Sequence, residues 1–203
     1  MLEEIYPPGL RVVFVGTAVT ELSDIVGFYH VHPRDRFWEL LELGGIVPKR
    51  FVTRQELKAL VDGHKDGSLS DPVRAIFTEK KKSKMLENGI GLTDLNRRDP
   101  VTDEKGKAAK PTGEDVQAFI AKTEKLKPRV AAFVILPELL VALFKDLFPA
   151  ATSELGRQAF SVGSTEIWLL GSTTAQLRGE ALERQEDAFF ALGERVEELR
   201  GSG

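Results

Sequence analysis

The chain has 203 residues, a formal net charge of −3 at pH 7, and 42% hydrophobic and 29% charged residues. This length fits one compact domain of roughly 100–200 residues, and the composition is that of an ordinary globular protein. The absence of cysteine excludes disulfides, thiol catalysis, iron–sulfur clusters and thiolate-ligated zinc. We therefore expect a single domain over residues 1–200 with a frayed tail over residues 201–203.

No apolar run reaches the ~20 residues that a membrane span needs, and no basic segment followed by an apolar stretch opens the chain. We therefore expect a cytoplasmic protein, associated with the nucleoid if bacterial, that does not contact membranes. The acidic total charge argues against polyanion binding driven by bulk charge. However, residues 79–110 hold nine basic and six acidic side chains. This local excess indicates either a solvated face or a surface that contacts a phosphate backbone.

Taken in chain order, four short apolar runs predict buried strands, at residues 10–15, 90–95, 130–136 and 166–170. Helical patterns lie between and after them, at residues 34–43, 53–61, 112–126, 137–148 and 180–200. The second of these helices opens with the capping-box pair Thr53 and Glu56. Strands that alternate with helices form a parallel sheet covered on both faces. The sequence therefore predicts an α/β fold with three α/β/α layers around a central, mostly parallel, four-stranded sheet.

Ligands of open α/β sheets bind at the carboxyl ends of the strands, where Gly16 and Asp94 fall in this sequence. The glycine patterns of phosphate-binding and dinucleotide-binding loops are both absent, so nucleotide hydrolysis and dinucleotide binding lose their usual sequence support. His30 and His32 would project to the same side of an extended segment, but no third metal ligand is indicated. We expect neither a metal site nor a cofactor.

Three separated blocks of the sequence match one known family in order and spacing. They are Pro8-Gly9-Leu10-Arg11-Val12-Val13-Phe14 continuing through Gly16, Gly27-Phe28, His32-Pro33 and Arg36-Phe37-Trp38; Gly89-Ile90-Gly91-Leu92-Thr93-Asp94-Leu95; and Gly163-Ser164-Thr165-Glu166-Ile167-Trp168-Leu169-Leu170. In these blocks the chain resembles the mismatch-specific uracil-DNA glycosylase and thymine-DNA glycosylase family, as a divergent bacterial-type member of the uracil-DNA glycosylase superfamily. The resemblance covers most of the chain, except residues 63–84 and 99–110.

The resemblance implies a monofunctional DNA glycosylase of base excision repair that acts on double-stranded DNA as a monomer without a cofactor. Such an enzyme flips a mismatched base out of the duplex and hydrolyses its N-glycosidic bond. The expected substrates are uracil, and also thymine or other damaged pyrimidines, in G·U and G·T mispairs. Two alternatives remain open: a DNA-binding relative with impaired catalysis, and a hydrolase of free nucleosides.

This chain lacks the Asn that the family uses to position the attacking water. That Asn stands in the family's first motif, whereas this chain has Gly16-Thr17-Ala18. Asp94 is our candidate substitute, because a carboxylate at the end of the middle strand could accept a proton from water and stabilise an oxocarbenium-like sugar. Asp24 is the second candidate. Alternatively, Asp94 caps a turn or pairs with Arg97 or Arg98.

The resemblance also assigns the base pocket. It implies that Gly16, Thr17, Ala18, Ser23 and His30 line this pocket, with His30 where the family stacks an aromatic ring on the flipped base. Imidazole can stack in the same way with a smaller area, and Tyr29 could contribute. The alternatives are that His30 has a purely structural role and that Ser23 caps a turn.

The DNA-reading loop is expected after the last strand. Its candidate contacts are Ser172, Thr173, Thr174, Gln176 and Arg178, supplemented by Arg97 and Arg98. Hydroxyls and arginines are suitable phosphate ligands, and Gln176 or Leu177 could fill the gap left by the flipped base. The hydroxyls are equally suitable as N-caps of the helix that follows.

Overall fold

The central sheet has five strands in the order β2-β1-β3-β5-β4. The computed structural model describes residues 2–97, 110–174 and 177–201. The strands are β1 (Val12–Ala18), β2 (Ile90–Asn96), β3 (Val130–Phe133), β4 (Gly156–Val162) and β5 (Thr165–Leu169). The first four in spatial order pair in parallel, and β4 pairs antiparallel with β5. The predicted α/β fold is confirmed, but the predicted number of four strands was wrong.

The strand missing from the prediction is β4, at the edge of the sheet. Its sequence contains Arg157, Gln158 and Ser161, and only two of its seven residues are buried. An edge strand with one solvated side does not carry the continuous apolar run that marks a buried parallel strand. Residues 163–164 turn the chain directly into β5, with Gly163 at a φ of 58°. The antiparallel hairpin therefore extends a parallel sheet without a crossover helix.

Seven helices are seen in the described ranges. They are α1 (Glu21–Val26), α2 (Phe37–Leu43), α3 (Arg54–Lys65), α4 (Asp71–Glu87), α5 (Gly113–Leu126), α6 (Pro137–Phe144) and α7 (Glu180–Gly201). All five predicted helices are present, with the predicted capping box of Thr53 and Glu56 at the start of α3. The helices α1 and α4 were not predicted. None of the helices within these ranges is long and apolar enough to cross a membrane.

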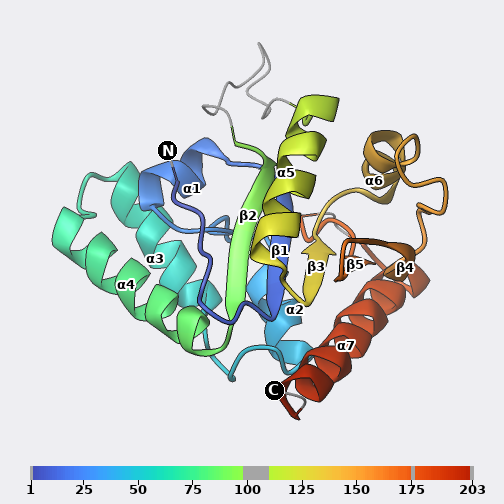
Figure 1. Cartoon of the computed structure of the whole chain (residues 1–203). Coiled ribbons are helices and arrows are strands. Elements are labelled where there is room, and N and C mark those ends of the chain that lie inside the picture. The colour runs from blue at the N-terminus through green and yellow to red at the C-terminus, as the bar shows by residue number, and fades with distance from the viewer. Residues whose placement is uncertain (1, 98–109, 175–176, 202–203) are drawn as a thin grey trace.

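Alternate residues of the strands enter two separate cores, which establishes three layers. In β1, Val12 and Phe14 join a core with side chains of α2, α3 and α7, whereas Val13 and Val15 join a core with α5 and α6. This alternation follows from the two-residue period of a strand. Figure 1 shows the sheet between α5 in front and α2 behind. Phe37 and Trp38 on α2 are buried in the first of these cores.

The basic segment over residues 79–110 begins in the second half of α4, and one lysine there, Lys81, is not solvated. Lys81 is buried, with its ammonium bonded to the Phe51 carbonyl and 3.0 Å from a carboxylate oxygen of Glu56. Its ammonium also lies 5.3 Å from the centroid of the Phe77 ring. A buried cation needs such partners because its desolvation is costly. Lys81 therefore ties α4 to α3 and is unavailable to a phosphate backbone.

The helices α2 and α7 cross so closely that the contact requires glycine. A Cβ on Gly193 would lie 1.8 Å from the carbonyl oxygen of Gly44, which is backbone and cannot rotate away. We expect Gly193→Ala to lower the free energy of unfolding by about 1–3 kcal/mol, the usual cost of overpacking. Urea denaturation measures this. Gly113→Ala is the control, because a Cβ there meets nothing within 4 Å; equal stability of the two variants would contradict the prediction.

Candidate functional site

A cavity of about 220 Å³ opens at the carboxyl ends of the central strands. Its walls come from the end of β1, the start of α1, the segment before α2, the end of β2 and the loop after β5. The lining residues are Gly16, Thr17, Ala18, Thr20, Ser23, Tyr29, His30, Val31, His32, Asp35, Asp94, Val134, Ser172, Thr173 and Thr174. All the residues predicted for the base pocket, the predicted catalytic residue and three predicted DNA-loop residues thus meet at one cavity.

Asp94 lies directly against the backbone of Gly16. The two residues are register partners in the parallel pair β1 and β2. A Cβ on Gly16 would lie only 2.1 Å from Oδ1 of Asp94, so any larger residue would displace the carboxyl group. Asp94 is only 8% exposed. The glycine at the end of β1 therefore makes room for a carboxylate in the wall of the cavity.

The ionisation of Asp94 is perturbed by its surroundings. Burial raises the pKa of Asp94 to about 6, although the positive charges of His30 and Arg97 oppose this and the carboxylate of Glu4 adds to it. A carboxyl group with a pKa near 6 is a better proton acceptor than an ordinary aspartate and is still ionised at neutral pH. Strongly shifted pKa values concentrate at functional sites. Asp94 has the properties of a general base.

A network of charges lies near Asp94. Arg97 donates a hydrogen bond to the Tyr29 hydroxyl (3.0 Å) and lies 3.7 Å from Glu4, which also pairs with Lys122 (2.5 Å). Asp94 and these charged side chains line a second cavity of about 260 Å³. Arg97, predicted to contact DNA, is thus half-buried and paired within the protein, and its charge favours the ionised form of Asp94.

His30 is held rigidly at the cavity wall by Asp35. Its Nδ1 lies 2.8 Å from Oδ2 of Asp35, and its ring stacks on Phe37 with centroids 3.8 Å apart. Burial raises the pKa of Asp35, but His30, the Thr173 hydroxyl and the Phe37 N–H outweigh this and hold it below its usual value. Asp35 is therefore an ionised acceptor, so Nδ1 of His30 must be the donor. The remaining ring nitrogen, Nε2, is left for a ligand.

Asp35 is a residue that sequence reasoning missed. Besides pairing with His30, its Oδ1 accepts a hydrogen bond from the Phe37 N–H at 2.9 Å, and it also bonds the Thr173 hydroxyl. An Asp side chain that accepts from the backbone N–H two residues further on forms an Asx-turn, a common local pattern. The prediction started this helix at residue 34, which placed Asp35 inside it. The helix actually begins at Phe37, and Asp35 connects the segment before α2 with the loop after β5.

The predicted pocket residue Ser23 lies in the first turn of α1. Thr20 caps this helix, accepting from the Ser23 N–H at 3.2 Å and donating to the Ser23 hydroxyl at 2.9 Å. Both hydroxyls line the cavity beside Thr17 and Ala18. The alternative in which Ser23 takes part in a turn cap is therefore seen, together with its place in the pocket. The second candidate carboxylate, Asp24, lines a different cavity.

The predicted DNA-reading loop begins at one wall of the cavity. The hydroxyls of Ser172 and Thr174 lie 3.0 Å apart, and Thr174 and Arg178 are exposed. Thr173 is buried and bonded to Asp35, so its hydroxyl faces the protein. Gln176 and Arg98, also predicted to contact DNA, lie outside the described residues.

The two histidines of the predicted pair are engaged separately. His30 has a left-handed φ of 53°, so the segment is not extended as expected. Whereas His30 pairs with Asp35, Nδ1 of His32 accepts the Arg34 N–H at 3.1 Å. Within residues 2–97, 110–174 and 177–201, no three His, Asp or Glu side chains form a group that could hold a metal ion.

A comparison of the chain with models of known protein families finds no match.

The raised pKa of Asp94 makes the free energy of unfolding depend on pH, whatever the activity of the protein. Because the pKa is raised in the folded state, the protonated form stabilises the fold at low pH, and this contribution is lost as pH rises through about 6. Asn does not titrate. We therefore expect Asp94→Asn to increase the free energy of unfolding, relative to the parent protein, more at pH 8 than at pH 4. Urea denaturation at both values tests this; an equal difference at both would contradict it.

Proposed function

We propose that the protein is a DNA glycosylase that hydrolyses the N-glycosidic bond of uracil, and also of thymine, in G·U and G·T mispairs. The observation that carries the proposal is the cavity in which the buried carboxyl group of Asp94 lies against Gly16 and near His30. At about 220 Å³, this cavity is smaller than most ligand pockets, which exceed ~300 Å³. It suits a single flipped base better than a whole cofactor or nucleotide.

Asp94 would act on the water. A water bound between the Asp94 carboxylate and the C1′ atom of the flipped nucleotide attacks C1′ as the C1′–N1 bond breaks. The electron pair of that bond leaves with the base, the water oxygen stays on C1′, and Asp94 takes the released proton. The negative carboxylate also stabilises the positive charge that develops on the sugar. No metal or cofactor takes part in these steps.

His30 would act on the base. Asp35 fixes the orientation of the ring, and a proton on Nε2 lets that nitrogen donate a hydrogen bond. Such a donor stabilises the negative charge on the departing pyrimidine, and the proton held by Asp94 is then returned to solvent or to the base. Phe37 covers one face of the ring, so stacking on a base would use the other face.

The outer contacts to DNA would come from the loop after β5. Thr174 and Arg178 are exposed in this loop and carry groups that bind phosphate oxygens. The hydrogen bond between Thr173 and Asp35 connects this loop to the residue that holds His30. Binding of a duplex at the loop would therefore influence the position of His30 through the hydrogen bonds of Thr173 and Asp35.

The pH dependence of excision follows from Asp94. A general base must be ionised, so the single-turnover rate should rise about tenfold per pH unit up to about pH 6. A pH–rate profile between pH 4.5 and 6.5 measures this. A rate that stays constant or falls between pH 4.5 and 6 would contradict the role of Asp94 as a base.

A substrate panel tests the proposal against its two alternatives. Single-turnover assays on duplexes with G·U, G·T and A·U pairs, and on single-stranded uracil DNA, should give abasic sites fastest from G·U. Salt-dependent duplex binding without excision would favour a catalytically impaired DNA-binding protein, because phosphate contacts release counterions. Hydrolysis of free uridine without any duplex binding would favour a nucleoside hydrolase.

A further inference from the structure

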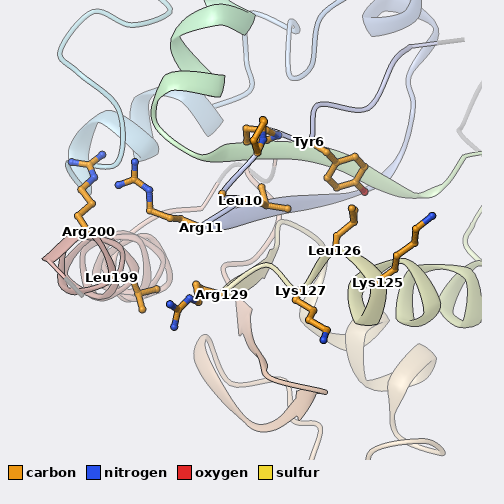
Figure 2. A pocket seen from close by; sticks show the side chains of 12 residues that line it. Tyr6, Leu10, Arg11, Lys125, Leu126, Lys127, Arg129, Leu199 and Arg200 are labelled. Atoms are coloured by element: carbon orange, nitrogen blue, oxygen red, sulfur yellow. The ribbon is translucent and has the colours of Figure 1, made fainter. Parts of the chain in front are cut away.

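Basic side chains surround another pocket, at the end of the sheet opposite the candidate active site. This pocket has a volume of about 700 Å³. It is formed by the segment leading into β1, the end of α5, the residues before β3 and the last turn of α7. Figure 2 shows three arginines on one side, Arg11, Arg129 and Arg200, and Lys125 and Lys127 on the other.

The described residues that line this pocket include five basic side chains and no carboxylate. The chain as a whole has a net charge of −3, so this distribution departs from its average. Arg200 donates to Glu197 at 2.9 Å, which offsets one of the five charges. The helices α4, α5 and α7 end here, and each helix end contributes about half a negative charge. An excess of roughly two positive charges remains after these offsets.

The shape and the other lining residues indicate the class of ligand. A volume of about 700 Å³ falls within the ~300–1,000 Å³ of small-molecule sites. Leu10 and Leu126 lie between the arginine side and the lysine side, and Tyr6 borders the pocket (Figure 2). Guanidinium groups bind phosphate oxygens with two parallel hydrogen bonds, which a carboxylate-free wall leaves available. We infer that this pocket binds a small polyphosphate anion, with its phosphate groups at the arginines.

This site is separate from the surface that would hold a duplex. The candidate active site lies at the carboxyl end of β1 and the basic pocket at its amino end, so a seven-residue strand of about 3.3 Å per residue separates them by roughly 20 Å. The two sites therefore lie at opposite ends of β1 and share no lining residue. The inference therefore does not rest on the proposed glycosylase activity.

Isothermal titration of the full chain with ATP, and separately with inorganic tripolyphosphate, tests the inference in magnesium-free buffer at low salt. The variant Arg11→Gln with Arg129→Gln removes two charges from the pocket. The control variant Lys49→Gln with Lys65→Gln removes two exposed charges elsewhere. We expect one ligand per chain, binding at least tenfold weaker in the arginine variant, and within twofold of the parent protein in the lysine variant and in Asp94→Asn.

The two titrants distinguish the source of the phosphates. Tighter binding of ATP indicates that Leu10, Leu126 and Tyr6 contact an organic part, whereas equal binding indicates that the phosphates alone are recognised. Arg200→Gln is the second variant should the double arginine variant fail to fold. Absence of binding by either titrant, or equal weakening in the arginine and lysine variants, would overturn the inference. So would a change of more than twofold in Asp94→Asn, in either direction, which would place the ligand in the candidate active site.

Discussion

Replacing Asp94 by Asn should lower the single-turnover rate of uracil excision by about 10²–10⁴-fold, the usual contribution of a general base. Asn is nearly the same size and fits beside Gly16, but it cannot accept a proton from water or carry the negative charge that stabilises the sugar. Affinity for a G·U duplex should change little, because Asp94 is buried at the cavity and does not reach the phosphates. Rates and binding are measured on the same labelled duplex.

Asp24→Asn is the matched control for this experiment. Asp24 is on α1 and lines a cavity other than the candidate site, so its replacement should leave the excision rate within a few-fold of the parent protein. The assignment would be wrong if the two variants were equally active. A large loss in Asp24→Asn alone would move the catalytic role to that residue.

Replacing Gly16 by Ala should lower the excision rate by about 10²-fold. The added Cβ would lie 2.1 Å from Oδ1 of Asp94, so the carboxyl group must move by about an ångström or more. A misplacement of ~1 Å at a reacting group can cost 10²-fold in rate. The matched control is Gly113→Ala, which adds the same methyl group where nothing lies within 4 Å.

A double variant tests whether the loss in Gly16→Ala passes through Asp94. If the only effect of the new methyl group is to displace that carboxylate, Gly16→Ala combined with Asp94→Asn should be no slower than Asp94→Asn alone. Single-turnover rates of the four proteins form the cycle. Additive losses would mean that Gly16 contributes to catalysis by a different route, such as backbone contact with the base.

The meeting of Gly16 and Asp94 could be predicted from the sequence because it depends on topology. Both residues end buried apolar runs, and the carboxyl ends of adjacent parallel strands lie side by side. The loop after β5 follows another parallel strand and lies at the same end of the sheet, but its assignment as the DNA-reading loop came from the resemblance. The topology determines which strand ends meet, and it can be predicted from the pattern of apolar residues alone.

The support of His30 could not be predicted in the same way. It depends on where α2 begins, since Asp35 turns toward His30 and Thr173 only because the helix starts two residues after it. It also depends on the left-handed backbone of His30, which is uncommon for residues other than glycine. The sequence left two roles open for Arg97, because an arginine after a strand has the same pattern whether it faces DNA or a carboxylate of the protein.

If the residues of this cavity excise uracil, the base is released from a G·U duplex under single-turnover conditions. The parent protein should convert the duplex to one with an abasic site that alkali cleaves, and Asp94→Asn, folded and bound to the same duplex, should not do so at a comparable rate. No abasic product from the parent protein at saturating concentration between pH 6 and 8 would contradict the proposed glycosylase activity.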